Sequence, residues 1–161
     1  MLFNNKQANY LDWFFIIAIV FMTGIAVICA KLVVDKVNDT GVFSDVPEAQ
    51  NAIDKSSSTL MSFDNLMIFV IIGLSVFVLV SSAVVFNHPS YFIAGTFLLF
   101  IAVTVAASIS NAFWKFTSSA NISATAALYP KLLFLMENFP LYIAFMGMAS
   151  AIVMYVAYMR E

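Results

Sequence analysis

The sequence predicts an all-α, polytopic membrane protein with four transmembrane helices and short interfacial helices. Its 161 residues are 63% hydrophobic and 10% charged, whereas a soluble domain is about half apolar and a quarter charged. Four apolar segments reach the ~20 residues that a helix needs to cross the hydrocarbon core of a bilayer. Two of these segments, residues 65–86 and 91–113, are separated by only four residues, which predicts a tight helical hairpin.

The first span is expected at residues 11–34, after a short polar lead. Tyr10 and Trp13 suit the headgroup layer, where amphipathic rings are favoured. Lys31, near the far end, is expected to extend its ammonium group to the headgroups. Cys29 is the only cysteine and cannot form an internal disulfide, so we interpret it as a small packed or lipid-facing side chain.

The only extended polar region is residues 35–64, where we expect a loop. Asp45 at an N-cap position predicts a short amphipathic helix, which the three serines beginning at Ser56 should end. Asp64 is expected to cap the second span. The carboxylates lack the dense alternating spacing of calcium loops, so a solvated acidic face is favoured over a cation site. The residues predicted to face a protein partner are Asp45, Glu48 and Asp54.

The predicted turn between the second and third spans holds His88, the only histidine. Pro89 cannot continue the preceding helix. Histidine titrates near neutrality, but no further ligand stands at zinc spacing, so a turn residue is favoured over a pH sensor or metal ligand. The third span, and a last span at residues 140–159, carry small residues four apart, which favour close helix packing. The predicted helix-packing residues are Ala102, Ala106, Ser110, Gly147 and Ala151.

Residues 117–139 are too apolar for a free linker and are interrupted before they could cross a bilayer. We expect Asn121 to cap a short helix and Pro130 to open another. Both helices should lie in the membrane interface or against the bundle. Asn121 also begins a glycosylation triplet, which we interpret as a chance match. Four spans would place both termini on one side of the membrane.

The sequence lacks the motifs of the common enzyme classes. It has no serine–histidine–acid set, no glycine-rich phosphate loop and no zinc spacing. No span carries an ionisable residue near its middle, where transporters and pumps usually keep one. The net charge of −2 argues against nucleic-acid binding. We therefore predict a protein without catalytic residues, cofactor or metal, whose first partner is the lipid bilayer.

Several short motifs follow one another in a recognisable order between Asp45 and the C-terminus. They are Phe63-Asp64 before the second span, the His88-Pro89-Ser90-Tyr91 turn, Ser110-Asn111, Tyr129-Pro130, Asn138-Phe139-Pro140, and a last span that ends in tyrosines and a basic residue. In this order the chain resembles the small four-span membrane proteins of tailless icosahedral phages with an internal lipid membrane. The resemblance implies a minor virion component that contacts the protein shell or neighbouring copies.

We therefore predict a non-enzymatic structural protein of the virion internal membrane, inserted in the host inner membrane before assembly. It would organise the vesicle and link it to the capsid. Its partners would be lipid, other copies of itself or other membrane proteins, and the capsid protein that the resemblance implies. Two alternatives remain: an accessory subunit of a cellular membrane complex, and a holin-like pore former.

Overall fold

The computed structural model describes residues 8–84 and 89–159 and folds them into helices, without a strand. The helices are α1 (Ala8–Asp39), α2 (Pro47–Val84), α3 (Pro89–Thr117), α4 (Ser123–Ala126), α5 (Pro130–Glu137) and α6 (Phe139–Tyr158). Segments of α1, α2, α3 and α6 are long and apolar enough to cross a membrane. The prediction of an all-α fold with four such helices is confirmed.

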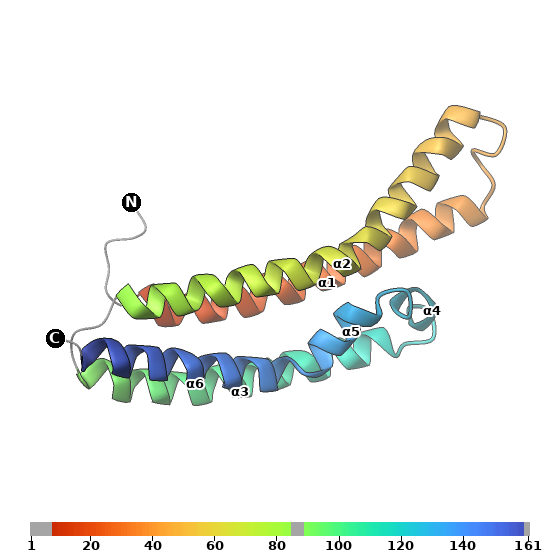
Figure 1. Ribbon diagram of the computed structural model, residues 1–161. Coiled ribbons are helices and arrows are strands. Elements are labelled where there is room, and N and C mark those ends of the chain that lie inside the picture. The colour runs from red at the N-terminus through yellow and green to blue at the C-terminus, as the bar shows by residue number, and fades with distance from the viewer. Residues whose placement is uncertain (1–7, 85–88, 160–161) are drawn as a thin grey trace.

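The four long helices form two antiparallel pairs, α1 with α2 and α3 with α6 (Figure 1). The start of α1 and the end of α6 lie at the same end of the bundle, and α4 and α5 cover the other end (Figure 1). Beyond α5, the end of α1 and the start of α2 continue together and bend away from α3 and α6 (Figure 1). We call this extension, residues 36–62, the arm.

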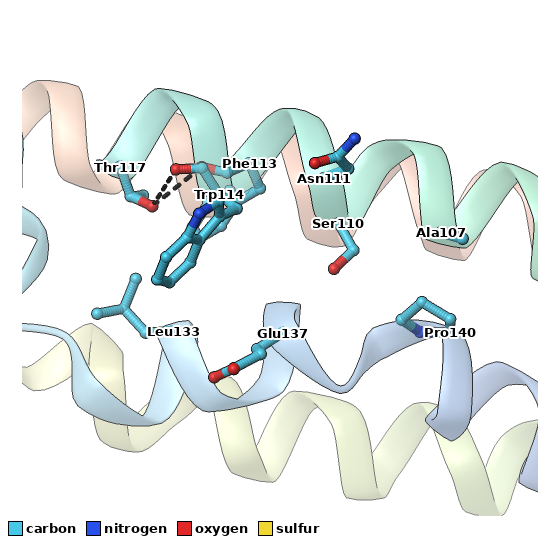
Figure 2. A pocket seen from close by; sticks show the side chains of 9 residues that line it. All are labelled: Ala107, Ser110, Asn111, Phe113, Trp114, Thr117, Leu133, Glu137 and Pro140. Carbon is cyan, nitrogen blue, oxygen red and sulfur yellow. Dashed lines mark hydrogen bonds between the residues drawn. The ribbon is translucent and has the colours of Figure 1, made fainter. Parts of the chain in front are cut away.

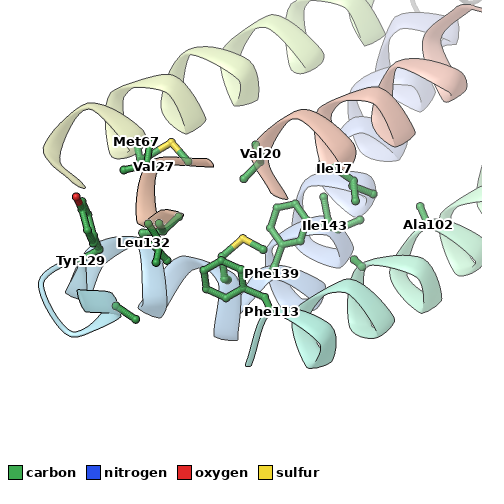
Figure 3. Packing of buried hydrophobic residues seen from close by; sticks show 14 of the residues in the cluster. Ile17, Val20, Val27, Met67, Ala102, Phe113, Tyr129, Leu132, Phe139 and Ile143 are labelled. Carbon is green, nitrogen blue, oxygen red and sulfur yellow. The ribbon is translucent and has the colours of Figure 1, made fainter. Parts of the chain in front are cut away.

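A small apolar core forms where α5 meets the long helices (Figure 3). Phe21 of α1 meets Phe113 of α3 edge-on, with ring centroids 6.4 Å apart. Gly24 of α1 allows α5 to approach closely, because a Cβ atom there would stand 3.2 Å from Cδ1 of Leu132. The side chains with almost no exposed surface include Ile17, Val20, Leu132, Met136, Phe139 and Ile143.

Many large apolar side chains of the long helices point outward instead. Phe69, Phe97, Phe100 and Phe145 are among the exposed residues. Exposed apolar area costs about 25 cal/mol per Å² in water, whereas lipid tails accept it without that cost. The outward apolar surface is therefore compatible with an integral membrane protein.

The polar region between the first two spans is largely helical, so the expected loop at residues 35–64 is wrong. α2 continues without a break through the serines that were expected to end a helix. Ser56 and Ser58 of this run, and Ser62 beyond it, bond to carbonyls of the same helix. The hydroxyls of Ser56 and Ser62 donate to the carbonyl four residues earlier, at 2.8 and 3.1 Å, and that of Ser58 to the one three residues earlier, at 2.9 Å. These bonds satisfy the hydroxyls without turning the backbone out of the helix.

The helix starts also differ from the sequence predictions. α2 begins at Pro47, two residues after Asp45, so Asp45 is not its N-cap. Pro89 is the first residue of α3 rather than part of a turn. Proline suits a first turn because its missing N–H would have no partner there. The N-cap of α4 is Ile122 instead of Asn121.

Candidate functional sites

The arm is an exposed acidic surface with an apolar tip. It carries four carboxylates and two lysines, for a net charge of −2. The three residues predicted to face a partner, Asp45, Glu48 and Asp54, are all exposed. Val42 and Phe43, at the turn between α1 and α2, are exposed as well. The arm therefore offers both charge and apolar area to a binding partner.

The two helices of the arm are joined by a side-chain hydrogen bond near the tip. Nε2 of Gln50 on α2 donates to Oδ1 of Asn38 on α1 at 2.8 Å, and also approaches Oδ1 of Asp54 at 3.4 Å. At the turn, Gly41 adopts a positive φ of 62°, a conformation that glycine takes without steric cost. These features hold the arm together where it has left the bundle.

Asp64 caps α5 instead of α2, so its predicted role at the start of the second span is wrong. It lies inside α2 and is only 7% exposed. Its Oδ1 accepts the backbone N–H of Leu132 at 2.9 Å, and its Oδ2 accepts that of Lys131 at 3.3 Å. The α5 N-cap residue, Tyr129, makes no side-chain cap bond. A carboxylate from another helix thus satisfies the free N–H groups of α5 and faces the positive end of its dipole.

A second polar contact ties the same two helices. The ammonium group of Lys131 on α5 donates to Oδ1 of Asn65, the residue after Asp64. The Asp64 and Lys131 contacts link residues 66 to 68 positions apart. We call this group, Asp64, Asn65, Lys131 and Leu132, the α2–α5 clasp.

Tyr129 places a hydroxyl group in the interior beside the clasp. Its side chain is fully buried and its Oη atom has no hydrogen-bond partner among the described residues. Burial raises the pKa of Tyr129 to about 12, and the negative charges of Asp35 and Asp64 add to the effect. The phenol is therefore neutral over the physiological pH range.

Lys31 differs from its sequence prediction. It is 5% exposed and pairs with Asp35, one turn later on α1, rather than extending to the surface. The pairing explains the burial, since a buried ammonium is tolerated when an opposite charge is in contact. The expectation that Lys31 reaches the headgroups overlooked Asp35, which lies one turn later on the same helix.

The small residues predicted to mediate helix packing differ in burial. Ala102, Ala106 and Gly147 are buried, and Ser110 and Ala151 are half-buried. Gly147 of α6 lies against Leu99 of α3: a Cβ atom at position 147 would stand 2.1 Å from Cδ1 of that leucine. Oγ of Ser110 donates to the Met136 carbonyl at 2.7 Å, joining α3 to α5. Any role of these residues in association between copies stays a prediction.

The two helix pairs also share a hydrogen bond within the spans. The hydroxyl groups of Ser75 on α2 and Tyr142 on α6 lie 2.5 Å apart. Tyr142 also approaches the Ile71 carbonyl, at 3.4 Å. Interhelical bonds of this kind contribute about 0.6 kcal/mol on average in lipid.

A pocket of about 310 Å³ opens between α3 and the segment from α5 to the start of α6 (Figure 2). Trp114 extends from α3 toward Leu133 of α5, with Glu137 beside them (Figure 2). The other lining residues are Ala107, Ser110, Asn111, Phe113, Thr117 and Pro140. Sequence reasoning did not anticipate this pocket, because Trp114 and Glu137 lie on different helices.

The residues that the structure describes contain no group of three or more His, Cys, Asp or Glu side chains that could hold a metal ion. His88 lies outside the described residues. Cys29 is a free, exposed thiol on α1. Comparison of the chain with protein-family models, curated proteins and solved structures gave no match.

Proposed function

We propose that this protein is a non-enzymatic structural membrane protein that presents the arm to a protein partner outside the bilayer. The observation that carries the proposal is the length of α2. Its 38 residues make a helix about 57 Å long, whereas the hydrocarbon core is about 30 Å thick. About 27 Å of helix therefore exceeds what anchoring requires, and this excess forms one side of the arm.

The chemistry of the arm indicates the kind of partner. The exposed side chains of Val42 and Phe43 lie in the chain between two exposed carboxylates, Asp39 and Asp45. A complementary surface would hold an apolar depression with basic residues at its edge, as interfaces commonly combine an apolar centre with a polar rim. The hydrogen bond between Gln50 and Asn38 limits the conformational entropy that the arm would lose on binding.

The setting we propose is the internal membrane of a phage virion, with the arm directed at the capsid protein. The support for this setting is the order of short motifs, in which the chain resembles the four-span proteins of membrane-containing phages. The region of resemblance runs from Asp45, within the arm, to the C-terminus. In this setting the four spans anchor the protein and the arm links the vesicle to the shell.

Mass spectrometry of purified virions tests the setting. The protein should be present in the particles and should be released when the lipid is removed. Its absence from virions would end the phage assignment. Dye leakage from cells that express the protein alone would favour a holin-like pore former, and co-purification with a defined complex from uninfected cells would favour an accessory subunit.

Site-directed cross-linking tests the role of the arm. In a Cys29→Ser background, Ser44→Cys places a photo-cross-linker at the exposed tip, and Ser119→Cys places it at an exposed site between α3 and α4. We expect adducts with capsid protein from position 44 and few from position 119. Equal yields from both positions, or none from position 44, would show that the arm does not mediate the contact.

A further inference from the structure

The pocket between α3 and α5 has one charged group that the protein itself leaves free. The hydroxyl of Ser110 donates to the Met136 carbonyl at 2.7 Å, and the hydroxyl of Thr117 donates within α3. The carboxylate of Glu137 makes no hydrogen bond or ion pair with any residue the structure describes. The pocket is therefore negatively charged and its charge is open to a ligand.

The aromatic wall of the pocket is also accessible. Trp114 is 61% exposed, although it is one of the largest apolar side chains of α3. In Figure 2 its ring extends from α3 toward Leu133 and Glu137 of α5. The face of an indole ring attracts cations, and its combination with a carboxylate is suited to an organic ammonium group.

The pocket lies at the level expected for lipid headgroups. Glu137 is two residues before the start of α6, whose 20 residues span about 30 Å, the thickness of the hydrocarbon core. Trp114 lies within one turn of the end of α3. A zwitterionic phospholipid presents an ammonium group at this depth. Leu133 and Pro140 of the pocket offer apolar surface to the rest of the lipid molecule.

We propose that this pocket binds a zwitterionic phospholipid, with its ammonium group between the Trp114 ring and the Glu137 carboxylate. Leu133 and Pro140 contact the apolar part of the same molecule. The lipid holds α3 and α5 together at the membrane surface. This site is independent of the arm, so the proposed partner contact and the lipid site can fail separately.

Fluorescence of Trp114 in non-ionic detergent tests the proposal. A Trp13→Phe background leaves Trp114 as the only tryptophan. Phosphatidylethanolamine should shift its emission saturably, and phosphatidylglycerol, which lacks the ammonium group, should bind at least about fivefold more weakly. Glu137→Gln should weaken phosphatidylethanolamine binding by about the same factor, whereas Glu48→Gln, an exposed carboxylate in the arm, should leave it unchanged.

Charge reversal and a soluble competitor decide the identity of the ligand. Glu137→Lys should invert the preference toward phosphatidylglycerol while the helical circular dichroism spectrum is retained. Equal affinity of the unmodified pocket for the two lipids, or unchanged affinity after Glu137→Gln, would overturn the proposal. The same emission shift from O-phosphoethanolamine at the same concentration would also overturn it, because the ligand would then be a soluble amine.

Discussion

Asp64 is the residue on which the position of α5 depends most directly. Replacing it with alanine would leave two N–H groups at the start of α5 without an acceptor, that of Leu132 buried and that of Lys131 partly buried. We expect Asp64→Ala to lower the free energy of unfolding in detergent by about 1–3 kcal/mol. Asp64→Asn, which keeps one acceptor oxygen but loses the charge, should have a smaller effect.

Asp54→Ala is the matched control for this prediction, because Asp54 is an exposed carboxylate on the same helix. Its effect should stay within about 0.5 kcal/mol. Denaturant titration followed by circular dichroism measures both variants. Equal losses at positions 54 and 64 would contradict the capping role.

Tyr129 should respond to substitution in the opposite direction. Its buried hydroxyl has no partner among the described residues, so Tyr129→Phe removes a desolvated polar group and should raise the free energy of unfolding by about 0–2 kcal/mol at pH 8. A loss of more than 1 kcal/mol would show that the hydroxyl makes a stabilising contact.

The same residue predicts a loss of stability at high pH. Because burial raises the folded-state pKa of Tyr129 to about 12, the unfolded phenol ionises first, near pH 10. Ionisation of this phenol leaves the free energy of unfolding unchanged below pH 10 and lowers it as the pH rises from 10 to about 12, at up to ~1.4 kcal/mol per pH unit. The difference between wild type and Tyr129→Phe, measured by unfolding and by absorbance at 295 nm, isolates this group from the other tyrosines.

Asp64 shows why the role of a single residue is hard to predict from the sequence. An aspartate before an apolar segment predicts a local N-cap, and that prediction uses only neighbours in the chain. The observed partners are Lys131 and Leu132, 67 and 68 positions away. No periodicity or spacing encodes such a contact. The one local signal is that Tyr129, the residue before Pro130, is not of a type that commonly caps a helix.

At the scale of elements, the contact between α3 and α6 depends on Gly147. An added Cβ atom there would stand 2.1 Å from Cδ1 of Leu99, so Gly147→Ala requires that leucine to move. We expect the free energy of unfolding to fall by about 1–3 kcal/mol. Gly73→Ala is the control, since nothing lies within 4 Å of a Cβ atom at that position.

A double-mutant cycle links the effect to its cause. Leu99→Ala removes the atoms that an alanine at position 147 would meet, so the second substitution should cost less in the Leu99→Ala background than in the wild type. Residues in contact commonly show non-additivity of 0.5–3 kcal/mol. Additive effects would mean that Gly147 stabilises the bundle through some contact other than Leu99.

The helices themselves were predictable to different degrees. The four spans follow from hydropathy, because ~20 consecutive apolar residues have few alternatives to a membrane helix. The continuity of α2 through Ser56 and Ser58 was not predictable from the sequence, because a run of serines usually indicates the end of a helix. Here the serine hydroxyls bond to carbonyls of their own helix, and the helix continues. The arm, and with it the candidate partner surface, was therefore expected as a loop.

At the scale of the whole molecule, the structure is asymmetric along the bundle. The arm, α4 and α5 gather at one end, and the start of α1 and the end of α6 lie at the other (Figure 1). With four spans, the arm and the clasp should lie on one side of the membrane and both chain ends on the opposite side. The proposed partner contact and lipid site would then share a surface.

Cysteine accessibility in sealed vesicles tests this arrangement. In a Cys29→Ser background, which has no other cysteine, we compare Ser44→Cys in the arm, Ser119→Cys between α3 and α4, and Met159→Cys after α6, all at exposed positions. A membrane-impermeant maleimide should label positions 44 and 119 from one side and position 159 from the other, because an ionised reagent does not cross the hydrocarbon core. Labelling of positions 44 and 159 from the same side would mean that an even number of helices crosses between them instead of the expected three, and the four-span arrangement would have to be abandoned.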